Sequence, residues 1–425
     1  MRAATRLSIP GGPLKTLPDK PGLHYGWVII ALGFLTIFVA LGMARFSYAV
    51  FLPGMHNGLG LSYQQLGFIG TSNFAGYLFA VIFTPFLIRR LQHRASITVG
   101  LTLIGISMFG ISRSSSFAAI AVLYILVGMG GGFANVSTMV LLPHWFRTQK
   151  RGTSAGIICG GSGLGIVFSG ILIPFLSRSI GAEGWRSGWL IFSGISLVIA
   201  ACVALFLRNS PVEKGLEPMG AAAPLKPDQM IPRDEKGKGR ILLHLGLLYG
   251  LFGITFMVYG TFIVATMVKE YGFTEAKAGL YWSWVGFFSL FSGVFFGTLS
   301  DRIGRNWGLA LVFLVQSAAY LLAGCNLGGA ALALSVVLYG CAIFAIPAIM
   351  AAAVGDYLGV SGAANAFVLV TIVFAVGQTI GPGAAGMIAG VTGSFTSTFL
   401  LSALLTAGAS LLAALLPKPH DIHGL

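Results

Sequence analysis

Twelve long apolar stretches recur along the sequence, and they constrain the fold more than any other feature. Each is close to the roughly 20 residues that an α-helix needs to cross a bilayer. Hydrophobic residues make up 56% of the 425 residues and charged residues only 9%, against roughly 25% charged in a soluble domain. The pattern predicts an all-α membrane protein and excludes a soluble enzyme, a disordered chain and a secreted disulfide scaffold. The predicted helices are 27–51, 65–87, 96–112, 117–141, 153–176, 189–207, 241–267, 279–299, 307–325, 332–353, 364–389 and 396–416.

One long polar segment divides these helices into two sets of six. Residues 208–240 contain five prolines and charges of both signs, a composition typical of a linker. A shift of 212 positions also aligns the two halves, placing Gly67 on Gly279 and Arg90 on Arg302. Two repeats joined by a linker are typical of secondary transporters, which bind substrate between the halves. The predicted organisation is a cytoplasmic tail at 1–24, a six-helix bundle at 25–207, a cytoplasmic linker at 208–240, a second six-helix bundle at 241–416 and a cytoplasmic tail at 417–425.

Basic residues predict how the chain is oriented in the membrane. With both termini inside, 20 of the 26 Lys and Arg residues fall on the inner side and five on the outer side. Cytoplasmic loops of membrane proteins carry such an excess. This loop excess explains the formal net charge of +14, so we expect no nucleic-acid partner. We predict a multi-pass protein of the bacterial inner (plasma) membrane with both termini in the cytoplasm.

The polar parts of the chain indicate neither an enzyme nor a metalloprotein. The four cysteines lie inside apolar runs without metal-ligand spacing, so we expect no disulfide, metal site or cofactor. The longest polar stretch between helices, 208–240, is too short to bury a catalytic or signalling core. We therefore expect no enzymatic activity and no sensor domain. The two-half repeat favours a carrier over a channel.

A charged motif follows the eighth predicted helix. Gly297-Thr-Leu-Ser-Asp301-Arg302-Ile-Gly304-Arg305 resembles the inner-loop signature of the major facilitator superfamily, Gly-x-x-x-Asp-Arg-x-Gly-Arg. The resemblance implies a twelve-helix carrier in which these side chains latch the two halves at the inner gate. We predict that Asp301 faces the start of the fifth helix. The predicted gating residues there and in the motif are Arg147, Arg151, Asp301, Arg302 and Arg305.

The first-half copy of this motif is degraded. Pro85, Arg89 and Gln92 stand where the signature has Gly, Asp and Gly. A latch at that loop cannot use the usual carboxylate. We hypothesise that Asp356, before the eleventh helix, supplies the carboxylate and pairs with Arg89.

Arg45 is the strongest candidate for a substrate-binding residue. All twelve acidic residues lie outside the predicted helices, and Arg45 is the one basic residue within them. A charge at this depth is costly and by default marks a substrate or ion pathway. The guanidinium stays charged and fits a carboxylate through two hydrogen bonds. An intramembrane Arg without an acidic partner therefore indicates an anionic substrate, and it argues against cationic solutes and against proton coupling through a carboxylate of the protein.

Arg45 also has a simpler interpretation as an interfacial anchor. It lies about 10 Å beyond the middle of its helix, a distance that a long side chain can bridge to reach the outer surface. We favour a binding role because charged residues in membrane helices usually face the bundle interior.

The fourth and fifth helices carry the motifs Gly128-Met-Gly130-Gly-Gly, Trp145-Phe146 and Gly160-Gly161-Ser-Gly163, and Tyr25-Gly26-Trp27 precedes the first helix. The resemblance is to the monocarboxylate transporter branch and its bacterial oxalate/formate-exchanger relatives. It implies that Arg45 replaces a first-helix Lys that binds substrate and relays protons, and that Tyr124 lines the cavity. The eighth helix departs from that branch, because 289–296 lacks its acidic–Arg pair.

Two further motifs are Ala44-Arg45-Phe46 in the first helix and Gly377-Gln378-x-x-Gly381-Pro382-Gly383 in the eleventh. In these the chain also resembles an orphan bacterial branch of the superfamily. Further polar or aromatic residues at membrane depth are candidates for orienting a ligand, although each can equally bond helices together. They are Asn73, Tyr124, Asn135, Tyr259, Trp284, Tyr339 and Gln378.

Together these features predict a major facilitator carrier that moves a small organic anion, with a monocarboxylate preferred, by alternating access. The predicted partners are that anion, a proton if transport is symport, and the lipid bilayer, and we expect a monomer. The alternative is an exporter of a neutral or amphipathic compound such as a drug or a sugar. Against it, Gly160-Gly161-Ser162 stands where drug–proton antiporters carry a Gly-Pro signature.

Overall fold

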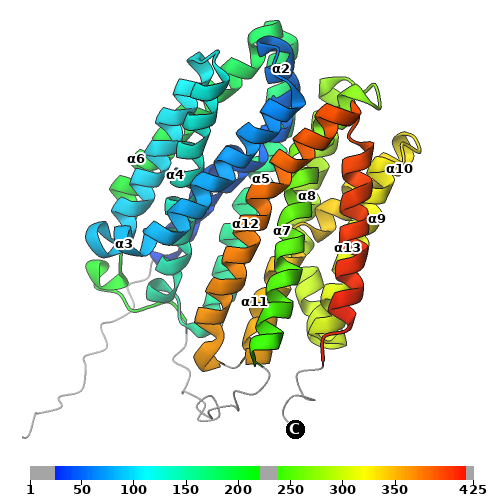
Figure 1. The fold of residues 1–425 in the computed structure, drawn as a ribbon. Coiled ribbons are helices and arrows are strands. Elements are labelled where there is room, and N and C mark those ends of the chain that lie inside the picture. The colour runs from blue at the N-terminus through cyan, green and yellow to red at the C-terminus, as the bar shows by residue number, and fades with distance from the viewer. Residues whose placement is uncertain (1–23, 221–237, 359, 418–425) are drawn as a thin grey trace, which may run out of the picture.

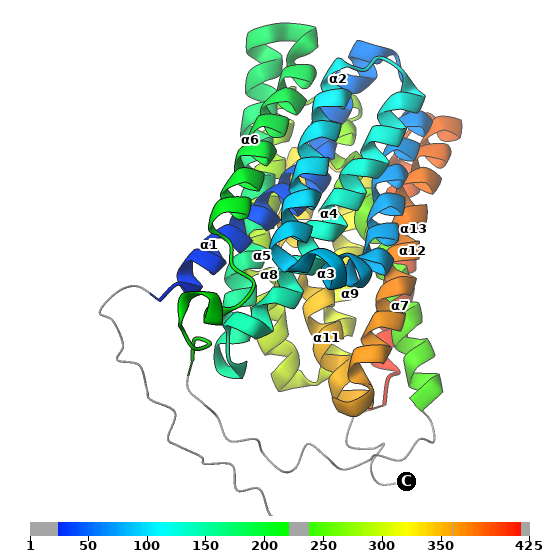
Figure 2. The same ribbon diagram turned by 90° about the vertical axis from the view of Figure 1, so that its left-hand side faces the viewer.

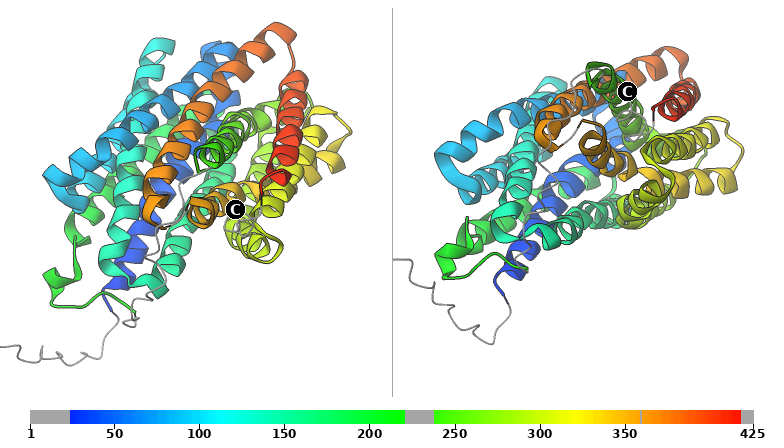
Figure 3. Two further views of the ribbon diagram at one scale, coloured as in Figure 1. Left: turned by 60° about the horizontal axis from the view of Figure 1, so that its bottom comes forward. Right: turned by 90° about the horizontal axis from the view of Figure 1, so that it is seen from below.

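The computed structural model describes residues 24–220, 238–358 and 360–417, and these residues form a bundle of long helices (Figure 1). Residues 24–220, here called the N-terminal half, and residues 238–417, the C-terminal half, lie side by side as two groups of helices (Figure 3). In Figure 2 the N-terminal half faces the viewer. The segment 208–220 lies at the lower left of Figure 1, and "lower" and "upper" refer to that view.

The N-terminal half contains α1 (Gly26–Ile37), the π-helix η1 (Phe38–Phe46), α2 (Tyr48–Leu59), α3 (Tyr63–Arg113), α4 (Phe117–Trp145), α5 (Thr148–Ile180), the short 3-10 helix η2 (Gly181–Glu183), α6 (Gly184–Phe206) and the 3-10 helix η3 (Pro211–Lys214). The C-terminal half contains α7 (Lys238–Lys269), α8 (Glu275–Ile303), α9 (Arg305–Gly324), α10 (Gly329–Ala342), α11 (Ala345–Leu358), α12 (Val360–Thr392) and α13 (Thr396–Ala414).

Eleven continuous helical stretches among the described residues are long and apolar enough to cross a membrane. The sequence predicts twelve, and the difference lies in α3, where the second and third predicted helices run together. The 51 residues of α3 would extend for about 76 Å if straight, more than twice the thickness of the hydrocarbon core. A bend at Gln92 divides α3, so this one stretch has the length for two crossings.

Gln92 adopts a backbone conformation that is essentially confined to glycine, with φ 62° and ψ 175°. Gly304, its counterpart under the 212-residue shift, also has a positive φ, of 96°. Asn209 holds the bend, because its side chain donates to Gln92 Oε1 at 2.9 Å and accepts from the Arg94 amide at 2.8 Å. The repeat noted in the sequence therefore extends to the backbone geometry of the two loops.

The first predicted helix is divided by the π-helix η1. Glycines allow η1 to cross α5 at close range: a Cβ on Gly42 would lie 2.7 Å from the Gly165 Cα atom. The Ala44 carbonyl accepts a hydrogen bond from the Tyr124 hydroxyl at 3.1 Å, which ties η1 to α4. π-Helical turns inside longer helices often occur at functional sites.

The two halves contact each other chiefly in their upper parts. The main helix pairs in contact are α5 with α8, α3 with α12 and α2 with α7, and α2 also touches α8. Near the top, Thr71 Oγ1 donates to the Thr379 carbonyl at 2.8 Å and accepts from the Gly383 amide at 2.9 Å. At the lower end, the Cβ positions of Gly156 on α5 and Gly297 on α8 face open space. The helices α5 and α8 therefore touch above and separate below.

The first part of the predicted linker is fastened to the lower end of the N-terminal half. The Met219 amide donates to the Trp145 carbonyl at 2.8 Å, and the Trp145 indole donates to the Arg208 carbonyl at 2.9 Å. Residues 221–237 of the predicted linker lie outside the described residues, as do most of the two predicted tails, and its last three residues, 238–240, form the start of α7.

We predict that Gly165→Ala destabilises the protein by about 1–3 kcal/mol, the usual cost of forcing extra atoms into a tight contact. Its Cβ would lie 2.6 Å from the Gly42 Cα atom and 2.8 Å from the Phe38 carbonyl oxygen, and neither backbone atom can rotate away. Thermal unfolding of the purified protein measures the loss. The matched control is Gly156→Ala on the same helix, where no atom lies within 4 Å; equal melting temperatures for the two variants would contradict the packing role.

Candidate functional site

Arg45 lies at the boundary between the two halves, at the end of η1. Its side chain is only 8% exposed. The guanidinium carbon lies over the rings of Phe74 and Tyr77 of α3, 4.5 and 4.7 Å from their centroids. From the opposite half, the Gln378 side-chain oxygen of α12 accepts a hydrogen bond from Arg45 Nη2. Arg45 is therefore enclosed by aromatic faces and neutral groups.

The charge of Arg45 has no carboxylate partner within the described part of the chain, whose ion pairs all lie elsewhere. A guanidinium only donates hydrogen bonds, so the Gln378 amide must turn its oxygen toward Arg45. That orientation leaves Gln378 Nε2 without an acceptor, and Arg45 Nε is also buried and unpartnered. An unpaired buried charge and two unpaired buried donors are costly. The arrangement is suited to receive an anion.

Three of the predicted site residues do not contact the guanidinium but hold its surroundings in place through hydrogen bonds. The Tyr124 hydroxyl donates to the carbonyl of Ala44, next to Arg45. Asn73 Nδ2 donates to the Tyr124 carbonyl at 3.4 Å, where α3 and α4 cross closely. Asn135 Nδ2 donates to the Tyr77 hydroxyl at 2.9 Å and so fixes the ring that covers the guanidinium. These contacts position Arg45 and its aromatic neighbours.

The other predicted residues lie away from Arg45. Tyr259 and Tyr339 stack within the C-terminal half at 4.0 Å, and their hydroxyls bond to Ser335 and to the Phe256 carbonyl. Trp284 is 38% exposed and stacks on Tyr281. It shares one face of α8 with the exposed apolar side chains Leu280, Phe287, Phe291 and Val294. Such a face is suited to lipid contact.

Sequence reasoning missed the aromatic residues around Arg45. Phe74 and Tyr77 flank the guanidinium, and Phe46 packs edge-on against Phe256 and Phe344 of the C-terminal half at 6.0 and 5.7 Å. Phe46 stands out in the sequence only as part of the Ala44-Arg45-Phe46 motif; membrane helices are rich in aromatic residues, so the other four carry no distinguishing pattern. The one available signal is that Phe74 and Tyr77 follow Asn73 within about one turn of the same helix.

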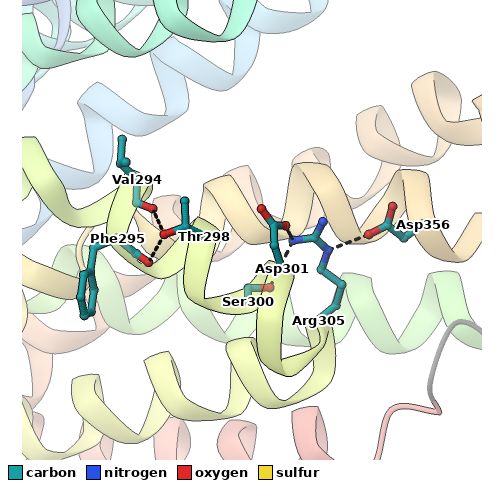
Figure 4. Close-up of polar contacts among 7 residues, drawn as sticks. All are labelled: Val294, Phe295, Thr298, Ser300, Asp301, Arg305 and Asp356. Carbon is teal, nitrogen blue, oxygen red and sulfur yellow. Dashed lines mark hydrogen bonds and ion pairs between the residues drawn. The ribbon is translucent and has the colours of Figure 1, made fainter.

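The signature motif forms a charged cluster at the lower end of the C-terminal half (Figure 4). Arg305 lies between two carboxylates: Nη1 is 2.5 Å from Asp301 Oδ1 and Nε is 2.6 Å from Asp356 Oδ2. Ser300 adds a third contact to the guanidinium at 3.3 Å. The hypothesised pairing of Asp356 with Arg89 is therefore wrong for this conformation. Arg89 belongs to the other half and is exposed, and the halves are separated at their lower ends.

The remaining predicted gating residues also stay within their own half. Arg147 pairs with Glu217 of the segment 208–220 at 2.6 Å, which ties the start of α5 to that segment. Arg151 donates to the Phe146 carbonyl at 2.9 Å, and Arg302 is exposed. Asp301 binds Arg305 rather than the start of α5, contrary to the prediction.

A cavity of about 510 Å³ opens at the upper end between the halves, well above Arg45. It is lined by the ends of α2, α5 and α8, with Asn57, Arg178 and Glu275 among its polar residues. This cavity is separate from the Arg45 centre.

The sequence matches the protein family described as "Uncharacterised MFS-type transporter YbfB" over residues 37–416. The chain belongs to this family. The match confirms the assignment to the major facilitator superfamily that the 297–305 motif predicts. The protein is thus a multi-pass membrane transporter.

Relatives of known name differ in what they carry. The chain is 24% identical to monocarboxylate transporter 2 of Mus musculus over 417 residues, covering 93% of this chain and 84% of that protein. It is also 24% identical to the hexuronate transporter of Bacillus subtilis (strain 168) over 394 residues, covering 88% and 91%. Nitrate transporter 2.2 of Chlamydomonas reinhardtii is 22% identical over 307 residues, covering 69% and 57%.

Solved structures share the fold. A D-xylose-proton symporter superposes with a TM-score of 0.76 at 14% identity, covering 93% of this chain and 99% of that one. A bacterial homologue of the human lysosomal transporter Spinster, in an inward-facing and occupied conformation, gives 0.71 at 15% identity, covering 93% and 96%. The predicted fold class is confirmed, and these neighbours are transporters rather than enzymes.

We predict that Arg305→Gln lowers stability by about 1 kcal/mol, within the range for partly exposed ion pairs. It removes the cation between Asp301 and Asp356, which are 59% and 45% exposed. The difference should shrink in 1 M salt, because salt screens exposed charges. Thermal unfolding at low and high salt measures it, with Arg302→Gln as the control on an exposed neighbour. A loss that does not depend on salt would show that the cluster acts through packing instead.

Proposed function

We propose that this protein moves a small organic anion, with a monocarboxylate preferred, across the membrane by alternating access. The observation that carries the proposal is the buried guanidinium of Arg45, which lies between the halves with no carboxylate near it in the described residues. A carboxylate substrate supplies the missing counter-charge. It also supplies acceptors for donors that the protein leaves unpaired.

The position of Arg45 links anion binding to movement of the two halves. Arg45 belongs to the N-terminal half and its partner Gln378 to the C-terminal half. An anion bound between them contacts both halves at once. Neutralising the charge lowers the cost of enclosing it away from water, so the loaded carrier closes more readily than the empty one.

The arrangement of the halves supports access from the lower end. Contacts between α3 and α12 close the upper end, and α5 and α8 separate below. We propose that the lower end faces the cytoplasm of a bacterium, with both termini on that side and the chain acting as a monomer in the inner membrane. The Asp301–Arg305–Asp356 cluster, with Arg89, Arg147, Arg151 and Arg302, then borders the inner gate.

A coupled proton would travel on the carboxylate of the substrate. The groups that contact the Arg45 side chain in the described residues are Gln378 and two aromatic rings, and none of them is an Asp, Glu or His. Proton coupling through a carboxylate of the protein is therefore not part of the proposal.

The burial of Arg45 counts against the alternative of a neutral-compound exporter. That alternative needs Arg45 as an anchor that reaches the outer surface. Its side chain is instead 8% exposed and bonded across the halves. The names of three relatives add support, because monocarboxylates, hexuronates and nitrate are all anions.

A thermal-shift panel on the purified protein tests the proposal, using small monocarboxylates, dicarboxylates, neutral sugars and organic cations near neutral pH. A ligand at 100 times its Kd stabilises a protein by about 2.7 kcal/mol. We expect monocarboxylates to give such a shift in the wild type and none in Arg45→Gln. Without ligand, Arg45→Gln should be at least as stable as the wild type, because it removes an uncompensated buried charge.

The matched control is Arg113→Gln, which removes an exposed positive charge from the upper end of α3. It should keep the full response to carboxylates. Stabilisation by sugars or cations alone, unchanged in Arg45→Gln, would overturn the anion proposal in favour of the exporter.

A further inference from the structure

Resting on the proposed function, we infer the substrate class of the Arg45 site. The substrate has a single carboxylate, which bridges Arg45 and Gln378, and an apolar body, which lies against an aromatic wall of the C-terminal half. We define the aromatic wall as Tyr249 and Phe256 of α7, Phe344 between α10 and α11, and Phe374 of α12. Neither a sugar acid nor a dicarboxylate fits this site.

The unpartnered donors specify the charged end of the substrate. Two buried donors at the centre lack acceptors, Arg45 Nε from one half and Gln378 Nε2 from the other. A carboxylate has two oxygens, each able to accept more than one hydrogen bond. One oxygen takes the guanidinium and the other takes the amide. The Gln378 amide thus donates to the second oxygen of the same carboxylate, so one acidic group provides acceptors for both donors.

The aromatic wall specifies the rest of the molecule. Phe374 lies one turn before Gln378 on α12, so the two side chains share a face. Phe374 stacks on Tyr249 at 4.6 Å between centroids, and Phe256 and Phe344 both contact Phe46, the neighbour of Arg45. Phe344 and Phe374 are half-buried, whereas Tyr249 and Phe256 are buried, so the substrate would meet the wall through Phe344 and Phe374.

The helices that carry the wall offer little to a polar body. Thr255 and Thr379, on the wall helices α7 and α12, bond to carbonyls of their own helices at 2.9 and 2.7 Å. Among the described residues of these two helices, the other buried polar atom without a partner is the Thr371 hydroxyl, and the wall itself adds one polar group, the Tyr249 hydroxyl. Thr371 lies two turns before Gln378, about 10 Å along the axis, and can serve at most one distant polar group.

These features exclude several anions by their chemistry. A hexuronate would bury several hydroxyls without partners, which is costly. A dicarboxylate would bring a second negative charge, and no second cation contacts Arg45, Gln378 or the wall in the described residues. Nitrate and acetate can accept hydrogen bonds from both donors. They have no large apolar group to pack against the aromatic wall, so they lose the contribution of apolar burial.

Isothermal titration of the purified full chain with five single anions tests the inference: phenylacetate, acetate, glucuronate, succinate and nitrate, near pH 7. Phenylacetate should bind at least about 10-fold more tightly than each of the others, given the apolar area that its ring buries. Gln378→Leu should weaken phenylacetate binding by about 10- to 100-fold, the effect of losing one hydrogen bond to a charged group.

The chain offers a matched control in Gln316→Leu. Gln316 is fully buried in the same half and its amide is also unpartnered, but it belongs to a different helix, α9. Its replacement should leave the Kd for phenylacetate unchanged. A second variant, Gln378→Glu, covers the case in which Gln378→Leu does not fold. It places a carboxylate on Arg45, so it should fold and bind none of the five anions.

The outcomes separate the two proposals. If none of the five anions binds the wild type, the proposed function fails together with the inference. If glucuronate, succinate or nitrate binds as tightly as phenylacetate, the inference is wrong and anion transport stands. Wild-type affinity for phenylacetate in Gln378→Leu or Gln378→Glu would also overturn the bridging role of the amide.

Discussion

A positive charge buried among neutral groups governs this structure. Arg45 is held between aromatic rings and an amide oxygen, with no carboxylate near it in the described residues. Removing a charge from water without a counter-charge is expensive, so such a site is retained only where something outside the protein completes it. An anion that arrives and leaves is the simplest such partner, and a carrier is the protein class that needs one.

Several features of the fold serve this site. Glycines bring η1 against α5, and the Tyr124 hydroxyl binds the backbone beside Arg45. The first-helix segment thereby departs from α-helical geometry at the residue that carries the charge. The halves meet above the site and separate below it. In the proposed mechanism, anion binding and the route of access therefore occupy one interface, across which Gln378 bonds to Arg45.

Much of the fold follows from the sequence, because membrane crossing imposes long apolar helices that are visible in one dimension. The signature at 297–305 identified the superfamily, and the lone charge of Arg45 pointed to the centre of the candidate site. Partners between distant helices were not predictable. Asp356 was expected to bind Arg89, yet it binds Arg305, because ion pairing depends on which halves are in contact. Phe74 and Tyr77 went unnoticed since aromatic residues are common in every helix, and Trp284 resembled a cavity residue although it is on an exposed apolar face.

The most direct measurement is an experimental structure with 4-bromophenylacetate, whose bromine can be located by its anomalous scattering. The account predicts the carboxylate between Arg45 and Gln378, and the bromine toward Phe256, Phe344 and Phe374. A ligand bound away from Arg45, or an Arg45 side chain directed to the upper surface, would contradict the claim that the substrate neutralises this charge.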